Sequence, residues 1–164
     1  MTTPPSLRAT APGERLYFED FEAGMSLDIE GPTVTEAQII EFARNYDPQP
    51  FHVDPEAARA SPYGGLISSG FMTTALAMRL ICDAYLLRSA GLGSPGLEEL
   101  KWLRPVRPGD RLRLRMTVES ARASRSKPDR GTVLHRWEVF NQHDELVMTM
   151  TGYGMFLKRP SAPA

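Results

Sequence analysis

The stretch SGFMTTALAMRLICDAYLLR, from Ser69 to Arg88, decides the fold. Ser68 or Ser69 can cap its start, because a serine side chain accepts a hydrogen bond from a backbone N–H of the first helical turn. Apolar residues cover most of its circumference, as in a helix that is enclosed on several sides. Arg79 and Asp83 stand four positions apart and predict an ion pair on the side that meets water or a partner. We therefore predict one long central helix, which at 1.5 Å per residue spans roughly 30 Å.

The chain after this helix has the pattern of β-strands. Glycines at positions 91, 93 and 96 end the helix. Residues 111–116 alternate arginines with apolar side chains, the period-two pattern of a strand with one exposed face. Strands are predicted at 97–103, 111–116, 132–140 and 146–157, with residues 120–130 as a long polar hairpin loop. Strands joined by hairpins run antiparallel, so we expect an antiparallel sheet.

The chain before the central helix is extended from residue 16 to 34 and then helical. Thr35 and Gln38 form a capping box, and the helix that they begin should end at Asp47, because Pro48 disfavours helical geometry in the residue before it. Asp54-Pro55 predicts the start of a second, short helix. The whole pattern predicts an α+β fold, with an antiparallel sheet of about five or six strands and one long buried helix.

Length and composition are those of one ordinary domain. The 164 residues can bury a core without disulfides or a metal. We place this domain at residues 15–158, between a flexible lead-in (1–14) and a flexible tail (159–164). A net charge of −1 gives no electrostatic reason to expect nucleic acid or a membrane surface as a partner.

The sequence also predicts a cytoplasmic location. The N-terminal residues contain no apolar stretch of the length that a secretory signal needs. Arg79 and Asp83 interrupt the longest apolar stretch, which argues against a transmembrane span. The lone Cys82 cannot form an internal disulfide, and we expect it to be a small buried hydrophobe in a reducing compartment.

Candidate catalytic residues lie just before the central helix, in FARNYDPQPFHVDPEAARASPYGGLISSGF, residues 42–71. Asp47 and His52 would be about 17 Å apart in an extended chain, at about 3.3 Å per residue. Pro48 and Pro50 exclude a helix between them, so a bent loop would have to bring the two side chains together. The spacing permits an acid–base pair without requiring one. The alternative is that Asp47 caps a turn and that His52 is a loop histidine with its hydrogen bonds satisfied.

Electrostatics favour a catalytic interpretation of these residues. Asp47 lies at the negative end of its helix dipole, which should raise its pKa and suit a general base or acid. Gly70 lies in the first turn of the central helix, where a free N–H points along a positive dipole. A carbonyl oxygen bound there would be stabilised as it gains charge, often by roughly 3 kcal/mol. The alternative is that Gly70 serves packing or a turn.

The same residues carry a resemblance to a known family. Asp47-Pro-Gln-Pro-Phe-His52 resembles the D-x-N-P-x-H motif of the MaoC-like dehydratases, which include the (R)-specific enoyl-CoA hydratases. Gly65-Leu-Ile-Ser-Ser-Gly70 is similar to the family's entry into its central helix. The resemblance covers about residues 18–157 and implies a hot-dog fold, in which the sheet wraps the helix, and a homodimer or a larger assembly of dimers.

The resemblance also implies a reaction, the reversible syn addition of water to a trans-2-enoyl-CoA. Asp47 and His52 would activate the water, and Gly70 would donate its N–H to the thioester oxygen. Gln49 and Ser69 would line the substrate site. No metal or redox cofactor is implied, since CoA arrives with the acyl substrate. Gln49 stands where the motif has Asn, and Phe51 replaces a small aliphatic residue, so the substrate is left open.

Other residues carry weaker signals. Arg104 and Arg107 could contact the CoA phosphates, because a guanidinium suits phosphate geometry. Arg111, Arg113 and Arg115 form a solvated strand face on the same pattern. His135 and His143 have no second ligand at metal spacing, so no metal site is predicted. Two alternatives to the hydratase remain at this stage, a hot-dog acyl-CoA thioesterase and a non-catalytic acyl-CoA-binding or dimerisation module.

Overall fold

The computed structural model describes Leu7 and residues 14–160. The predicted lead-in (1–14) and tail (159–164) fall mostly outside these residues. The helices are α1 (Glu36–Tyr46), α2 (Pro50–Val53), α3 (Pro55–Ala60) and α4 (Gly70–Ala84), with 3-10 turns η1 (Phe18–Asp20) and η2 (Leu86–Arg88). The strands are β1 (Ser26–Thr33), β2 (Gly91–Gly93), β3 (Leu97–Trp102), β4 (Arg111–Ala123), β5 (Arg130–Phe140) and β6 (Leu146–Leu157).

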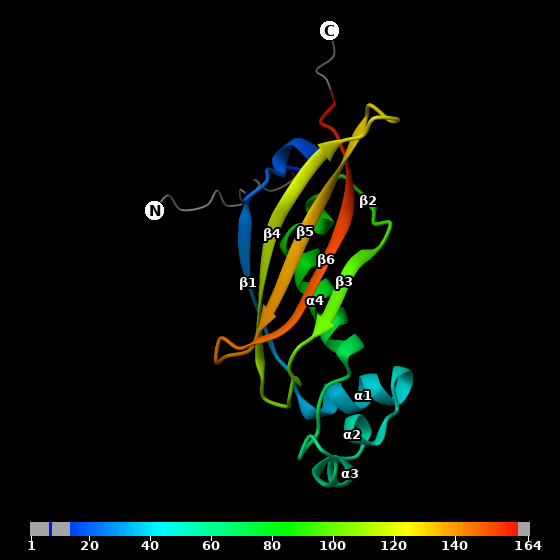
Figure 1. Ribbon diagram of the computed structural model, residues 1–164, viewed down its shortest axis with the longest axis vertical. Helices are drawn as coiled ribbons and strands as arrows, with labels where there is room; N and C mark the ends of the chain where they lie inside the picture. Colours follow the sequence, from blue (N-terminus) through cyan, green and yellow to red (C-terminus); the bar gives the residue numbers. More distant parts are fainter. Residues whose placement is uncertain (1–6, 8–13, 161–164) are drawn as a thin grey trace.

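The six strands form one antiparallel sheet that wraps α4 (Figure 1). Its order is β1-β4-β5-β6-β2, and β3 also pairs with β6, beside β2. Helices α1, α2 and α3 gather at one end of the sheet, at the bottom of Figure 1. The α+β architecture and the hot-dog arrangement expected from the sequence are confirmed.

Helix α4 is enclosed by the sheet on one side and open on the other. Met72, Ala77 and Ile81 are buried and belong to the same core cluster as the inward residues of β4, β5 and β6. On the open side Phe71 is 63% exposed and Met78 is 44% exposed. The segment that includes α4 and η2 is long and apolar enough to cross a membrane by length and composition alone, but the core helix of a soluble protein passes the same test. One side of it packs in the core of the sheet, as in a core helix.

Helix α4 also confirms a predicted ion pair, whereas its length is shorter than expected. Arg79 and Asp83 form the i,i+4 pair at 2.7 Å. The helix ends at Ala84 instead of Arg88 because Tyr85 leaves helical geometry, with φ −151° and ψ −31°. Tyr85 is fully buried, and its hydroxyl accepts a hydrogen bond from Trp137 at 3.2 Å. Cys82 is half-buried, so the expectation of a buried thiol was too strong.

Two sequence predictions of loops were wrong. Residues 120–130 are not one hairpin loop, because β4 continues to Ala123 and β5 begins at Arg130, past a bulge between Val118 and Ser120. The only apolar side chains in residues 120–123 are the small Ala121 and Ala123, so the pattern gives a weak strand signal. The glycines after the helix are not only a helix end, since Gly91–Gly93 form β2 against the end of β6.

Candidate active site

The structure brings Asp47 and His52 together at the end of α1. Asp47 is the C-cap of α1, and its Oδ2 lies 3.4 Å from His52 Nε2. The His52 side chain is 6% exposed and that of Asp47 19% exposed, so the imidazole is buried while the carboxylate stays accessible. The expectation that the prolines exclude a helix here was wrong. Pro50 is the first residue of the single turn α2, a position where proline's fixed φ and missing N–H are tolerated, and this turn carries His52 back toward Asp47.

Asp47 is held in place by two hydrogen bonds. Ser69 Oγ donates to Asp47 Oδ2 at 2.7 Å, and Gln49 Nε2 donates to Oδ1 at 2.7 Å. Ser69 is also the N-cap of α4, where its Oγ accepts a hydrogen bond from the Phe71 N–H at 3.2 Å. The longer Gln49 side chain therefore reaches the carboxylate, and one serine joins the end of α1 to the start of α4.

The pKa of Asp47 is lowered, contrary to the expectation from the helix dipole. Burial acts most strongly and raises this pKa, but the hydrogen bonds from Ser69 and Gln49 and the nearby His52 together outweigh it. The two hydrogen bonds stabilise the ionised carboxylate, and His52 does so when its ring carries a positive charge. Asp47 is thus an anion at neutral pH and a hydrogen-bond acceptor on both oxygens.

The tautomer of His52 follows from its second contact. His52 Nδ1 lies 2.8 Å from the carbonyl oxygen of Ile67, which can only accept a hydrogen bond. In the neutral imidazole the proton is therefore on Nδ1, and the lone pair of Nε2 faces Asp47 Oδ2. Two acceptors that face the same space suit a molecule with two O–H donors. Water has this property.

Both residues line a cavity of about 480 Å³ that also reaches the start of α4. Gly70 is the first residue of α4, so its N–H has no acceptor within the helix. A Cβ at Gly70 would lie 2.5 Å from the Trp102 ring, so the structure supports the packing interpretation of this glycine. Both roles are compatible, since the indole lies over the Cα while the N–H remains available. The other lining residues include Gln49, Phe51, Tyr63, Ser68, Phe71, Thr73, Trp102, Leu103, Arg104 and Val106.

The predicted substrate residues lie at different distances from this cavity. Gln49 lines it, whereas Ser69 is fully buried and uses its hydroxyl for Asp47 and Phe71. Arg104 lines it and pairs with Glu145 at 3.4 Å. Arg107 is outside the lining, but it donates to the carbonyl of Tyr63, a lining residue, at 2.7 Å.

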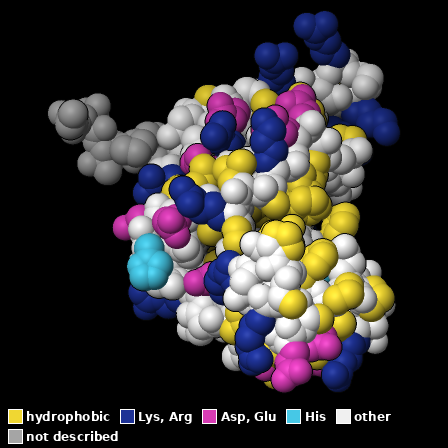
Figure 2. Space-filling view, turned by 60° about the horizontal axis from the view of Figure 1, so that its bottom comes forward, with side chains coloured by type: hydrophobic (Ala, Val, Ile, Leu, Met, Phe, Trp, Pro, Cys, Tyr) yellow, Lys and Arg dark blue, Asp and Glu magenta, His cyan; other side chains and the backbone are white. Residues whose placement is uncertain are grey.

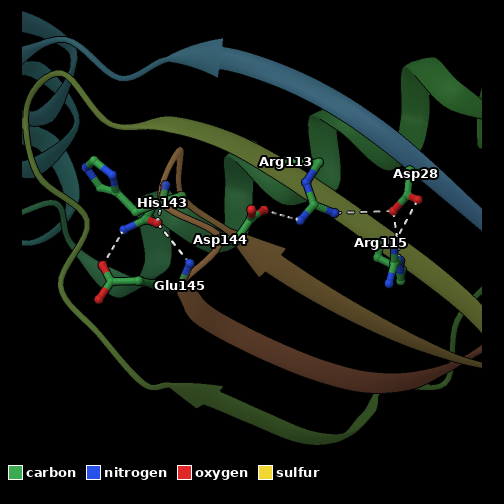
Figure 3. Close-up of polar contacts among 7 residues, drawn as sticks. Asp28, Arg113, Arg115, His143, Asp144 and Glu145 are labelled. Atoms are coloured by element: carbon green, nitrogen blue, oxygen red, sulfur yellow. Dashed lines mark hydrogen bonds and ion pairs between the residues drawn. The ribbon is translucent and has the colours of Figure 1, made fainter.

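Two further arginines of the basic cluster, Arg113 and Arg115, are engaged in ion pairs on the strand face (Figure 3). Asp28 pairs with Arg113 at 3.4 Å and with Arg115 at 2.8 Å, and Arg113 also reaches Asp144 at 2.9 Å. These contacts agree with the expectation of a solvated strand face for this part of the cluster.

Sequence reasoning missed the aromatic wall of the cavity. Trp102 is stacked edge-on against Phe71, with ring centroids 5.2 Å apart, and donates from Nε1 to Thr74 Oγ1 at 3.2 Å. Tyr63 packs against Phe51 at 5.2 Å. Trp102 stands directly before the arginine segment 104–107, and a large aromatic residue at the end of an exposed strand was the available signal.

The fold and this site are those of a hot-dog protein with an acidic residue and a histidine at the amino end of its central helix. A family model described as the MaoC like domain matches residues 20–138. The chain therefore belongs to the MaoC-like dehydratase family.

Several known proteins are similar to this chain. The crystal structure of a MaoC-like dehydratase from Rhodospirillum rubrum has a TM-score of 0.84 and 40% identity, covering 89% of this chain and 99% of that one. The 3-hydroxyacyl-thioester dehydratase Z of Mycobacterium tuberculosis is 40% identical over 49% of this chain and 55% of that protein. R-hydratase PhaJ1 from Pseudomonas aeruginosa has the same fold, with a TM-score of 0.72 at 22% identity over 92% of this chain and 95% of that one. The chain spans only part of the curated relatives that it matches, 31% of the length of one and 55% of dehydratase Z.

The lowered pKa of Asp47 predicts a pH-dependent contribution to stability. A carboxyl whose pKa is lower in the folded than in the unfolded protein stabilises the fold above the unfolded value, and this contribution is lost as pH falls through the folded value. We expect the difference in unfolding free energy between the wild type and Asp47→Asn to be constant from pH 7 to about 5 and to shrink as the pH falls below 3.8, the ordinary value. Urea unfolding at each pH measures it. A difference that grows on acidification would mean that the pKa is raised.

Proposed function

We propose that this protein is an acyl-CoA hydratase/dehydratase, which adds water reversibly and syn to a trans-2-enoyl-CoA to give an (R)-3-hydroxyacyl-CoA. The observation that carries the proposal is the 3.4 Å approach of Asp47 Oδ2 and His52 Nε2 in a cavity that also contains the start of α4. Membership of the MaoC-like family supports it. A relative is named 3-hydroxyacyl-thioester dehydratase Z, and dehydration of a 3-hydroxyacyl thioester is the reverse of the proposed hydration.

The Asp47–His52 pair activates the water. A water bound between the two acceptors directs its own lone pairs outward, toward the substrate. As its oxygen bonds to C3 of the enoyl group, one of its protons passes to the pair, and the pair delivers a proton to C2 on the same face. General acid–base catalysis of this kind contributes roughly 10²- to 10⁴-fold in rate.

The start of α4 stabilises the charge that develops on the thioester. Addition at C3 moves electrons through C2 onto the thioester oxygen, which becomes enolate-like. The Gly70 N–H, at the positive end of the α4 dipole, donates a hydrogen bond to this oxygen. The reaction uses only the substrate, water and these side chains, so the proposal includes no metal or redox cofactor.

Replacing either member of the pair should remove activity without unfolding the protein. We expect Asp47→Asn and His52→Ala each to lower kcat/KM for hydration by at least about 10²-fold. The assay is the loss of the conjugated-thioester absorbance of crotonyl-CoA and of longer or branched enoyl-CoAs. His143→Ala is the matched control, because His143 does not line the cavity and its ring points away from the neighbouring ion pairs (Figure 3).

The same variants separate the two alternatives. A thioesterase would release free thiol from saturated acyl-CoA, and Asp47→Asn would abolish that release. A non-catalytic module would bind acyl-CoA without any turnover. Full hydration activity in Asp47→Asn or His52→Ala would contradict the proposed mechanism.

Arg104 is proposed to bind a phosphate of CoA at the entrance of the cavity, with Arg107 as a second contact. We expect Arg104→Gln to raise KM for an enoyl-CoA about 3- to 10-fold, the weight of one charge-assisted contact, and to leave kcat unchanged. The N-acetylcysteamine thioester of the same acyl group has no phosphates, so its KM should not change. Arg113→Gln is the control, since Arg113 pairs with Asp28 and Asp144. Equal effects on both thioesters would exclude the phosphate contact.

The protein is further proposed to be a cytoplasmic homodimer or an assembly of such dimers. Large hydrophobic side chains are exposed around the start of α4 and the end of β3, namely Phe71, Trp102 and Leu103. Figure 2 shows hydrophobic side chains gathered in the middle of one face, with charged side chains around them. Such a patch is typical of a surface that another chain covers, and β3 has an edge without a paired strand among the described residues.

Sedimentation measures the assembly. We expect a species of at least twice the chain mass of 18.3 kDa. Leu103→Asp should weaken it, because a carboxylate in an apolar contact is costly to desolvate. Leu87→Asp is the control, a 72% exposed leucine in η2 that does not line the cavity of Asp47 and His52. A wild-type monomer at micromolar concentration would contradict the dimer.

A further inference from the structure

A second cavity, of about 360 Å³, lies between the later turns of α4 and the sheet. Met78 and Ile81 of α4 line one side of it, and β5 and β6 line the other. It shares no lining residue with the cavity of Asp47 and His52. Met78 and Leu97 are 44% and 47% exposed, so this cavity reaches the surface between α4 and β3. The other lining residues include Tyr85, Leu86, Trp137, Met150, Met155 and Phe156.

One buried polar side chain in this apolar wall has no hydrogen-bond partner among the described residues. His135, on β5, is 1% exposed and lines the cavity. Its ring is stacked on Trp137, with centroids 5.0 Å apart, and faces Tyr85 at 5.9 Å. Within the described part of the chain neither ring nitrogen has a hydrogen-bond partner. Buried polar groups are nearly always paired, because leaving one unpaired costs free energy.

The other polar side chains around the cavity are already engaged. The Tyr85 hydroxyl accepts from Trp137 at 3.2 Å, and the Tyr153 hydroxyl donates to Glu98. Ser94 Oγ donates to the carbonyl of Gly96 at 3.2 Å. Among the described residues that line the cavity, His135 is therefore the polar side chain that makes no hydrogen bond at all, and a polar group that enters the cavity could satisfy it.

The charge state of His135 defines its complement. Burial lowers the pKa of His135 to about 4, and the backbone of Val133 offsets this only in part, without meeting hydrogen-bond geometry. The ring is neutral at pH 7, with one nitrogen that donates and one that accepts. A carboxylate is disfavoured as a ligand in this apolar cavity. It can only accept hydrogen bonds, and its negative charge would lose its hydration on entering. A hydroxyl group both donates and accepts, so it can bond to whichever nitrogen faces it.

We propose that this cavity binds an aliphatic chain that carries a hydroxyl group, with the apolar wall enclosing the chain and His135 hydrogen-bonded to the hydroxyl. The two cavities lie along one helix, and Met78 is eight residues beyond Gly70, about 12 Å at 1.5 Å per residue. A long acyl group that extends from the thioester could supply such a chain, and a free hydroxy fatty acid could supply it as well. The first source rests on the proposed function, and the second does not.

Trp137 provides a binding signal that is independent of catalysis. In a Trp102→Phe background Trp137 is the remaining tryptophan, and it lines the cavity beside His135. Titration with ω-hydroxydodecanoate and with dodecanoate should change its fluorescence, and the hydroxylated acid should bind about 10-fold more tightly, the factor for one hydrogen bond between neutral groups. Equal affinities, or no change in Trp137 fluorescence, would overturn the proposal.

Variants of His135 assign the preference to its ring. His135→Phe should remove the preference and keep the affinity for dodecanoate, whereas His135→Gln, which still donates and accepts, should retain part of it. His143→Phe is the control and should leave the preference unchanged. A preference that survives in His135→Phe would refute the role of the imidazole. If His135→Phe does not fold, Met78→Tyr at the cavity mouth must weaken both acids, and unchanged binding would refute the site.

Turnover distinguishes the two sources of the chain. If the chain is the acyl group of the substrate, kcat/KM of the wild type should favour an ω-hydroxydodecenoyl-CoA over dodecenoyl-CoA, and His135→Phe should abolish this preference. Preference in binding without preference in turnover supports the free acid as the ligand. Preference in binding with no turnover of either thioester would reject the proposed function and leave this site intact.

Discussion

The hydrogen bond from Ser69 to Asp47 is the contact on which the geometry of the candidate active site depends. It joins the C-cap of α1 to the N-cap of α4, twenty-two residues later in the chain. The same hydroxyl caps α4, so one side chain positions both the ionised carboxylate and the first turn of the helix. Because α4 is fixed inside the sheet, Asp47 takes its position from the core of the protein and not from its own loop.

Much of this arrangement could be predicted from the sequence, because it depends on local chemistry. The capping box at Thr35 and the alternation in β4 each fix one element, and both are present. The direction of the Asp47 pKa could not be predicted. The helix dipole is visible in the sequence, whereas the hydrogen bond from Ser69 exists only after folding and, with Gln49 and His52, outweighs the effect of burial. The turn α2 was missed because Pro50 was taken to exclude a helix that it in fact begins.

His135 illustrates what pattern alone leaves out. The period of two in β5 places it on the inner face with Val133, Trp137 and Val139, and all four are buried. The sequence therefore predicts that this histidine is inside. It does not reveal that the ring has no polar neighbour there, because this depends on which side chains of α4 and β6 surround it. An unmatched polar group is a property of the assembled core.

The contact between Gly70 and Trp102 links the shape of the cavity to the position of the proposed oxyanion donor. Any side chain at position 70 would displace the indole, and the indole forms the wall of the cavity beside the proposed oxyanion donor. The outline of the substrate and the electrostatics of the reaction therefore share one steric constraint. Natural variation at either position should be correlated, with a smaller residue at 102 wherever 70 is no longer glycine.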